Sequence, residues 1–305
     1  MGIIRNTYKN KGLFFMALPG IAIIFMFYYM PMFGLVVAFK NFNYSDGVWG
    51  SAWVGFENFK LLAASRETIW RLSRNTIGYW ILFTTIGTLC NVTLAILLNE
   101  IKGKWFSKIS HTIMIFPTFI SWIAVTFIVT ALLHYEKGMI NHTLQYFGGV
   151  PVQWYFSPDK WPAILLLVNL WKNTGYGSIL YLSALTGIDP ELYEAARIDG
   201  ANRWMQVKTI TIPMLIPVVS IMTLMSMGGI MTSNTGLFYQ VTKNIGMLYP
   251  TTQTIDAYVM NTLTNGSVNF GMTSAVTLFQ SVVGCVMVIF ANLVVRRMES
   301  ENALF

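Results

Sequence analysis

Long apolar runs separated by shorter polar segments dominate this sequence. A helix needs about 20 apolar residues to cross roughly 30 Å of hydrocarbon. The pattern therefore predicts six transmembrane helices, over residues 13–39, 76–98, 110–133, 161–186, 213–233 and 272–295. Since no internal repeat is evident, we expect an all-α membrane protein with a single transmembrane domain over residues 1–305.

Basic residues distinguish the two sets of segments that connect these runs. The set formed by the N-terminus, 99–109, 187–212 and the C-terminus holds 11 Lys and Arg residues in about 60 positions, among them Arg5, Lys9 and Lys102. The other set holds 8 in about 100 positions, within 40–75, 134–160 and 234–271. Because basic residues favour the cytoplasmic side, both termini are expected in the cytoplasm.

Composition supports the membrane assignment. Of the 305 residues, 54% are hydrophobic and 11% are charged, which is too apolar for an ordinary soluble domain. The net charge of +7 lies mainly in the predicted cytoplasmic segments, so it indicates membrane orientation rather than a nucleic-acid partner. The first apolar run is too long for a cleaved signal peptide, so we expect it to be retained as the first span of a multi-pass membrane protein.

The predicted spans carry almost no ionisable chemistry. They contain no Asp or Glu, which argues against a proton-coupled carrier, and their one charge is Lys172. Lys172 either extends to water at the outer interface or faces a cavity. Gly103-Lys104 is followed by Trp105 rather than Ser or Thr, so no phosphate-binding loop is present, and the three histidines lack metal-ligand spacing. We expect no catalytic residue, metal or cofactor in this chain.

The first outer segment contains an apolar and basic stretch, Phe56 to Arg74, that is typical of a helix lying in the membrane interface. Its role is either a plain anchor or a gate.

The segment between the fourth and fifth predicted spans, 187–212, has strong helix-boundary signals. Asp189 can cap a helix that begins with Pro190, and Gly200 permits a tight turn. A second amphipathic stretch starts at about Asn202 and is expected to end before Pro213. This pattern predicts two short cytoplasmic helices, which form either a docking element for a partner or an ordinary surface connection.

Within this segment, Glu194-Ala195-Ala196, Asp199-Gly200-Ala201 and then Ile210, Pro213 and Pro217 resemble the EAA loop of type I ABC importer permeases. The likeness extends upstream through Tyr181 to Leu185 and Ile188 to Pro190. The six-span layout resembles the maltose-transporter-like sugar permeases. Two positions depart from the usual loop, Val207 where an aromatic is common and Ile212 where Leu is common, and both remain apolar.

The N-terminal part adds a further likeness. Tyr29 to Gly34, Ala38 to Phe42 and Trp53 to Phe59 resemble the oligosaccharide and polysaccharide subgroup of these permeases. Together the similar segments cover nearly the whole chain.

The resemblance implies a multi-pass permease subunit of a bacterial plasma membrane that forms, with a second permease, the path for importing an oligosaccharide. The implied partners are a second homologous permease, two ATPase subunits that bind ATP and Mg, and an extracellular solute-binding protein. The implied ATPase-coupling residues are Glu194, Ala195, Ala196, Arg197, Asp199, Gly200, Ala201 and Pro213. The alternatives are a stand-alone secondary carrier or channel for a small polar solute and a membrane scaffold without transport.

Polar and aromatic residues cluster in the fourth span, a region that lines the cavity in related permeases: Asn169, Trp171, Lys172, Asn173 and Tyr176. Aromatic faces and amides suit a sugar, so these residues are candidates for the substrate path. The alternative is bundle packing with interfacial Trp anchors. Met225, Met227, Gly228 and Gly229 of the fifth span form either a flexible gate or ordinary helix packing.

Overall fold

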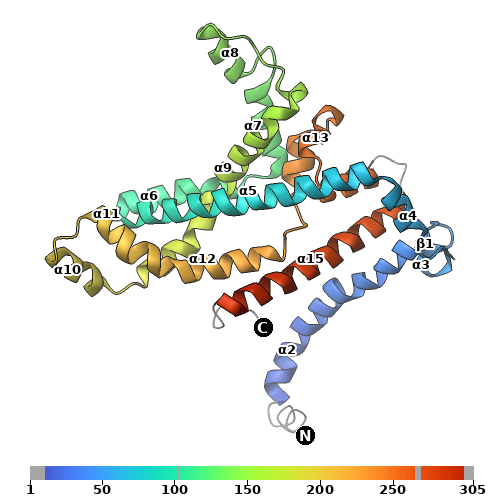
Figure 1. The fold of residues 1–305 in the computed structure, drawn as a ribbon, viewed down its shortest axis with the longest axis horizontal. Helices are drawn as coiled ribbons and strands as arrows, with labels where there is room; N and C mark the ends of the chain where they lie inside the picture. Colours follow the sequence, from blue (N-terminus) through green and yellow to red (C-terminus); the bar gives the residue numbers. More distant parts are fainter. Residues whose placement is uncertain (1–10, 102, 265–268, 299–305) are drawn as a thin grey trace. The chain divides into compact units, whose positions relative to one another are not determined.

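The structure is a computed structural model that describes residues 11–101, 103–264 and 269–298. Arg5, Lys9, Lys102 and both ends of the chain, on which the predicted orientation partly rests, lie outside the described residues. The described chain is helical, with one pair of two-residue strands (Figure 1). It divides into two compact units, Met1–Arg66 with Asn265–Phe279, and Glu67–Thr264 with Gln280–Phe305. The single domain over 1–305 remains a prediction.

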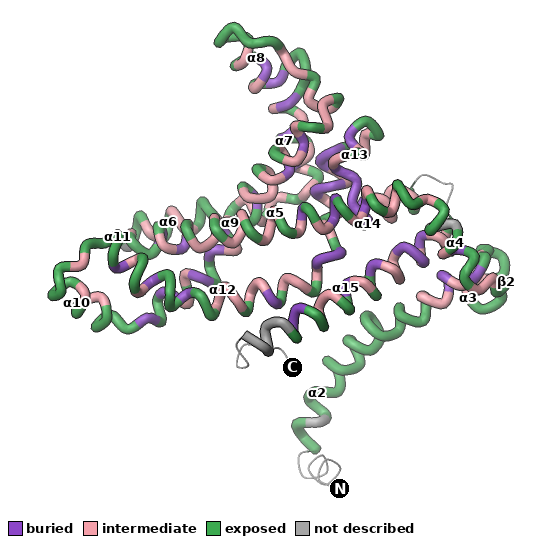
Figure 2. Tube along the Cα trace, viewed as in Figure 1, coloured by how far each residue is buried: buried purple, intermediate pink, exposed green. Residues whose placement is uncertain are grey.

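The first unit begins with the predicted first span. Helix α2 (Lys11–Ile24) continues through one π-helical turn (Phe25–Tyr29) and a 3₁₀ segment (Met30–Phe39). The whole stretch, Lys11–Phe39, is long and apolar enough to cross a membrane. Figure 2 shows α2 exposed along its length, which is how an apolar helix covered by lipid or by another membrane subunit is expected to look.

The remaining elements of this unit are β1 (Lys40–Asn41), α3 (Gly47–Gly50), β2 (Ala52–Trp53), α4 (Glu57–Ala64) and α15 (Phe270–Met298) as far as Phe279. Strands β1 and β2 are antiparallel. The buried Lys40 ammonium donates to two carbonyl oxygens of α3, both at 2.9 Å. Asn58 donates to the carbonyls of Ala38 and Lys40 at 2.9 and 3.0 Å. A Cβ at Gly271 would lie 2.5 Å from the Asn58 amide nitrogen, so only glycine allows this contact.

The second unit contains ten α-helices among its described residues. They are α5 (Arg66–Asn99, from Glu67), α6 (Lys104–Ile115), α7 (Trp122–Leu133), α8 (Met139–Tyr146), α9 (Trp161–Thr186), α10 (Pro190–Ile198), α11 (Arg203–Gln206), α12 (Ile212–Met227), α13 (Tyr249–Thr252) and α14 (Ile255–Thr264). The rest of α15 also belongs to it. The interfacial helix expected over Phe56 to Arg74 is wrong as one element, because α4 ends at Ala64 and α5 begins at Arg66.

Four described helices are long and apolar enough to cross a membrane, and five if one bent pair counts as a single span. The four are Lys11–Phe39, Arg66–Asn99, Arg203–Met227 and Phe270–Leu293. Helix α9 covers the predicted span 161–186 as a continuous helix, but it is not among them. Its polar residues, which include Asn169, Lys172 and Asn173, lower its hydropathy.

The span predicted over 110–133 is not one straight helix. Helix α6 is followed by a 3₁₀ turn (Phe116–Phe119) and a break, and the two helical parts meet at 97°. Pro117 has no N–H to continue an α-helical ladder. Beyond the break, the Ser121 hydroxyl caps α7 by accepting from the Ala124 N–H at 3.2 Å.

The helix before Pro213 does not end there, contrary to prediction. Helix α11 passes through a π-helical turn (Val207–Thr211) directly into α12, so that helix is continuous over Arg203–Met227. Pro213 lies at the start of α12, where the π-helical turn has already displaced the regular hydrogen-bond pattern. The helix ends at Met227, before the predicted limit of 233.

Two apolar clusters hold the second unit together. In one, the fully buried Trp161 and Leu165 of α9 pack with residues of α7 and with Leu237 and Val241 from the segment after α12. In the other, Ala95, Tyr181, Leu185, Ile188 and Leu215 join α5, α9 and α12. The second cluster supports the start of the 187–212 loop.

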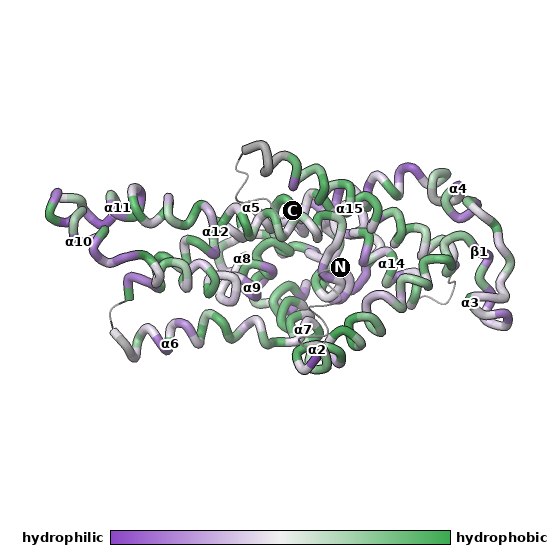
Figure 3. Tube along the Cα trace, turned by 90° about the horizontal axis from the view of Figure 1, so that it is seen from below, coloured by the Kyte–Doolittle hydropathy of each residue, from purple (hydrophilic) through white to green (hydrophobic). Residues whose placement is uncertain are grey.

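Helix α5 sets the two ends of this unit apart. Near its start, Arg74 donates to the Pro250 carbonyl at 2.8 Å and Asn75 to the Gln253 carbonyl at 3.0 Å. Just after its end, Glu100 pairs with Arg203 at 3.2 Å. Its 34 residues correspond to about 50 Å, more than a bilayer core. Figure 3 shows several hydrophilic residues at the α10 and α11 end.

Asn141 organises the 134–160 segment, and its loss should destabilise the protein. Its side chain, 1% exposed, bonds the carbonyls of Tyr135 and Val152, the Val152 N–H and the Trp154 indole, at 2.9 to 3.0 Å. Asn141→Ala leaves several polar groups without partners, so we expect a fall in Tm of roughly 5 °C or more. Thermal unfolding in detergent measures this. The exposed neighbour variant His142→Ala should stay close to wild type, and equal Tm values for both would refute the assignment.

Candidate coupling loop and translocation path

Helix α10 begins as the sequence predicts. The Asp189 carboxylate accepts from the Glu191 N–H at 3.0 Å, and Pro190 occupies the first turn. The Glu191 carboxylate lies at the positive end of the helix dipole. These interactions fix the start of α10 without any partner chain.

The turn after α10 depends on Gly200. The Ala201 N–H donates to the Ala196 carbonyl at 2.8 Å and the Gly200 N–H to the Arg197 carbonyl at 3.1 Å, the two bonds of a Schellman motif. Gly200 has φ +79°, which other residues adopt at a cost. Asn202 then caps α11 by accepting from the Met205 N–H at 2.9 Å. The bend between α10 and α11 is therefore specified locally.

The predicted coupling residues form one exposed group with one exception. Glu194, Ala195, Arg197, Asp199 and Gly200 are exposed on α10 and its turn, with Ala196 and Ala201 half-buried beside them. Pro213 lies away from them in sequence, at the start of α12. Sequence reasoning missed Leu192 and Ile198, which are 45% and 87% exposed and lie with Ala195 on one helix face. Their i, i+3, i+6 spacing is the signal that could have revealed this apolar ridge.

Contacts on the other face of α10 attach the loop to the helical bundle. Tyr193 packs on the cluster around Leu215, and its hydroxyl lies 3.0 Å from the Thr211 hydroxyl. The Glu100–Arg203 pair ties α11 to the end of α5, although a half-exposed pair contributes only about 1 kcal/mol or less. Movement of the loop can thus be transmitted to α5 and α12.

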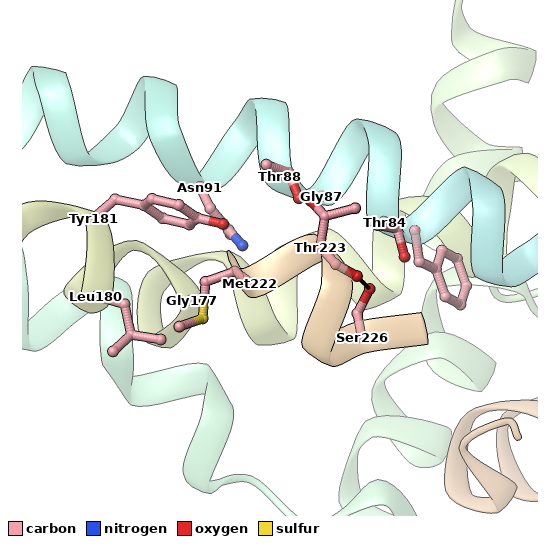
Figure 4. A pocket seen from close by; sticks show the side chains of 11 residues that line it. Thr84, Gly87, Thr88, Asn91, Gly177, Leu180, Tyr181, Met222, Thr223 and Ser226 are labelled. Carbon is pink, nitrogen blue, oxygen red and sulfur yellow. Dashed lines mark hydrogen bonds between the residues drawn. The ribbon is translucent and has the colours of Figure 1, made fainter. Parts of the chain in front are cut away.

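A cavity of about 300 Å³ lies between α5, α9 and α12 (Figure 4). Its polar lining consists of hydroxyl and amide groups without any charged side chain: Thr84, Thr88, Asn91, Tyr181, Thr223 and Ser226. The Trp80 indole of α5 donates to the Ser226 carbonyl of α12 at 2.9 Å, which fixes the two helices at its rim.

Glycine creates room for the amide in this cavity. A Cβ at Gly177 of α9 would lie 2.5 Å from the Asn91 amide nitrogen. Asn91 can therefore lie against α9 only because position 177 lacks a side chain. Thr88 and Asn91 follow Thr84 at i+4 and i+7 on one face of α5, and this polar stripe within an apolar span is the signal that a search for ionisable groups missed.

The residues predicted for the substrate path occupy different faces of α9. Asn169, Asn173 and Tyr176 share the face that leads to Leu180 of the cavity, and Asn173 donates to Asn169 at 2.8 Å. Trp171 is 47% exposed on another face. None of these four lines the cavity itself.

Lys172 occupies the break between α6 and α7. It is 5% exposed, and its ammonium donates to the carbonyls of Pro117 and Thr118 at 3.1 and 2.9 Å and to that of Ile120. The ammonium also lies 5.1 Å from the centroid of the Trp122 ring. Burial argues against both expected roles, extension to water and exposure to a cavity. The cation instead bonds backbone carbonyls at the break: that of Pro117 also accepts the Ile120 N–H at 3.2 Å, and the ammonium supplies a donor to those of Thr118 and Ile120.

Close packing of α6 on α9 places Lys172 beside the break. A Cβ at Gly175 would lie 1.7 Å from the Met114 carbonyl oxygen, so the two backbones touch there. The Thr118 hydroxyl in turn donates to the Lys172 carbonyl at 2.7 Å.

An exposed loop and an uncharged polar cavity between long apolar helices are the features of a transporter's membrane subunit. Residues 91–300 match the family of the binding-protein-dependent transport system inner membrane component, and the chain belongs to this family. The resemblance inferred from the EAA-like loop is confirmed. The chain is a multi-pass transporter subunit of the bacterial plasma membrane rather than an enzyme, and in such importers the ATPase is a separate subunit.

Known proteins similar to this chain agree with the family. The polygalacturonan/rhamnogalacturonan transport system permease protein YteP of Bacillus subtilis is 31% identical, with 98% of this chain and 92% of YteP covered. A chain of a bacterial ABC transporter that imports the acidic polysaccharide alginate has a TM-score of 0.86 and 30% identity over 98% of this chain and 100% of its own length. A chain of the alginate transporter, solved in complex with a periplasmic protein bound to alginate pentasaccharide, has a TM-score of 0.85 and 30% identity, with 98% of both chains covered.

Replacement of Lys172 tests its role at the helix break. Lys172→Met keeps the length of the side chain but removes the donor to the carbonyls of Thr118 and Ile120 and one of the two donors to that of Pro117, so we expect a loss of stability of roughly 3 kcal/mol, read as a lower Tm and reduced transport. Lys108→Met, at an exposed lysine of α6, is the matched control and should behave as wild type. A Tm for Lys172→Met equal to that of the control would show that Lys172 is dispensable at the break.

Proposed function

We propose that this chain and a second homologous permease form the translocation path of an ABC importer for an oligosaccharide delivered by an extracellular binding protein. The observation that carries the proposal is the cavity between α5, α9 and α12. Its hydroxyl and amide groups suit sugar hydroxyls, and its volume of about 300 Å³ is at the lower end of the range for small-molecule sites. The similar proteins named above transport polysaccharides or their fragments, which supports the substrate class.

We extend the proposal to six crossings with cytoplasmic termini. The crossings are Lys11–Phe39, α5, the broken pair α6 and α7, α9, α11 with α12, and α15. Helix α9 is less apolar than the others, but Lys172 is bonded to carbonyls and Asn173 to Asn169, so these groups do not face hydrocarbon unpaired. The excess of Lys and Arg in the segments at the α10 end supports the orientation.

The exposed loop is the proposed contact for an ATPase subunit. The eight predicted coupling residues, Glu194 to Arg197, Asp199 to Ala201 and Pro213, remain in the proposal, with Leu192 and Ile198 added as its apolar ridge. Two ATPase subunits would bind ATP and Mg, and their closure would draw the loops of two permeases together. Because α11 continues into α12, that movement would tilt a cavity-lining helix and alternate access to the cavity.

Affinity purification from the native membrane tests the assembly. Copurification of a second permease and an ATPase, with ATP hydrolysis stimulated by one loaded binding protein, would support the proposal. A chain that purifies without an ATPase would contradict it.

Variants of the loop should uncouple the ATPase without removing the chain from the membrane. Glu194→Lys reverses an exposed charge, and Gly200→Asp puts a side chain at φ +79°. We expect at least a tenfold loss of copurified ATPase for each, since disruption of a docking contact costs about 1.4 kcal/mol or more. Lys108→Glu on α6 provides a charge-reversal control. ATPase recovery at the wild-type level from both loop variants would exclude this surface as the docking site.

Replacement of Asn91 tests the cavity. Asn91→Leu removes the amide while keeping similar volume, so we expect the KM for uptake to rise about tenfold through loss of one or two hydrogen bonds. Copurification of the ATPase should be unchanged. Leu89→Ala, an exposed position on the same helix, is the control. Wild-type uptake kinetics in Asn91→Leu would place the path elsewhere.

A further inference from the structure

A second cavity, of about 440 Å³, lies between α7, the turn at residues 153–156 and Lys243. We propose that this cleft, called here the aromatic cleft, binds an acidic saccharide through a sugar carboxylate before the sugar enters the translocation path. The inference rests on the proposed function and adds to it a site and a chemical class of ligand.

The position of the aromatic cleft suits a site for entry from outside. The Thr251 hydroxyl donates to the Pro158 carbonyl at 2.6 Å, which ties the 153–158 turn to the segment bound by Arg74 at the start of α5. The proposed coupling loop is attached just beyond the other end of α5, at Glu100. The aromatic cleft therefore lies at the end of the second unit that the proposed orientation places outside the cell.

Four of the nine residues that line the aromatic cleft are Trp, Tyr or Phe. Trp154 and Tyr155 are half-buried, and Tyr135 and Phe156 are 44% and 60% exposed at its edge. Aromatic faces pack well against the C–H groups of a pyranose ring, and two rings at an open edge are accessible to an incoming chain. This arrangement favours a sugar over a small ion.

The two half-buried rings are held in place by their neighbours. The Trp154 indole donates to Asn141, and its carbonyl accepts from the Trp161 indole at 2.8 Å. The Tyr155 ring lies 5.0 Å from that of Trp161, and its hydroxyl is 3.3 Å from the Thr130 hydroxyl. Burial raises the pKa of Tyr155, with a smaller opposing contribution from that hydrogen bond, so the phenol stays neutral. A fixed surface of this kind loses little entropy when a ligand binds.

Charge decides which kind of sugar fits. None of the residues that line the aromatic cleft is Asp or Glu, while Lys243 lines it with an exposed ammonium 5.1 Å from the Tyr155 ring centroid. A second ammonium, that of Lys160, lies 5.4 Å from the ring centroid of Trp154. A carboxylate on a stacked sugar would meet a cation here, whereas the cavity between α5, α9 and α12 offers none.

The backbone at Lys243 is fixed by the end of a helical segment. Lys243 and Asn244 have φ values of 54° and 50°, which are uncommon for residues other than glycine. The Asn244 N–H donates to the Tyr239 carbonyl at 3.0 Å and the Lys243 N–H to the Gln240 carbonyl at 2.9 Å, the two bonds of a Schellman motif. The Asn244 amide also bonds Asn261 at 2.6 Å. The backbone from which the Lys243 side chain leaves is therefore held in one conformation.

Equilibrium binding to the complete transporter in nanodiscs, without its binding protein, tests the inference. The probes are a short oligouronate and the same oligosaccharide with its carboxylates methyl-esterified. Lys243→Asn removes the charge but suits a positive φ, and Lys243→Arg retains the charge. We expect the oligouronate Kd to rise about tenfold in Lys243→Asn and to stay near wild type in Lys243→Arg, with no change for the ester. Phe156→Ala should raise the Kd of both ligands, and the control Lys137→Asn, at an exposed lysine, should leave both Kd values unchanged.

Three results would overturn the inference. The first is that the wild-type complex binds the acid no better than the ester. The second is that Lys243→Asn raises the Kd of both ligands equally. The third is that Lys243→Asn leaves both Kd values unchanged and instead lowers affinity for the binding protein, which would make the aromatic cleft a protein-docking surface. In each case the ATPase copurification and its stimulation by a loaded binding protein remain an independent readout, so failure of this inference is distinguishable from failure of the proposed function.

Discussion

Hydrocarbon offers no hydrogen bonds, so every backbone group within it needs a partner inside the protein. This constraint explains the most unusual element of the chain, the break between α6 and α7. A break exposes carbonyl groups that a continuous helix would satisfy, and the Lys172 ammonium bonds three carbonyls there, one of which also accepts a backbone N–H. The one charged residue in the predicted spans thus stabilises the bent helix beside α9.

Helix α5 connects the two functional ends of the second unit. Polar contacts at its start hold the segment around residue 250, its middle turns contribute a stripe of hydroxyl and amide groups to the cavity, and Glu100 just beyond its end is paired to the loop. In the proposed mechanism a movement at the loop reaches the cavity through rigid helices, without a flexible relay. The uncharged cavity lies along the middle of this helix, and the cationic aromatic cleft lies toward its start.

Local signals in the sequence predicted much of this arrangement. The cap at Asp189, the turn at Gly200 and the apolar length of most spans depend on nearby residues, and these predictions hold in the structure. The break after α6 has local signals in Pro117 and the Ser121 cap, but the apolar length of the run concealed it. The continuation of the helix through Pro213 depends on a π-helical turn, which no local pattern specifies. The role of Lys172 could not be predicted, since its partners lie more than 50 positions away. The polar lining of the cavity, by contrast, could have been predicted from the polar stripe at Thr84, Thr88 and Asn91.

Accessibility of the cavity during the ATP cycle is the most direct test of the account. A single cysteine at Thr88 or Ser226, in a background without Cys90 and Cys285, can be labelled with a membrane-impermeant thiol reagent from either side of proteoliposomes that contain the complete transporter. The account predicts reaction from one side without nucleotide and from the opposite side when ATP is trapped. Labelling that is confined to one side in both states, or absent in both, would contradict a path through this cavity.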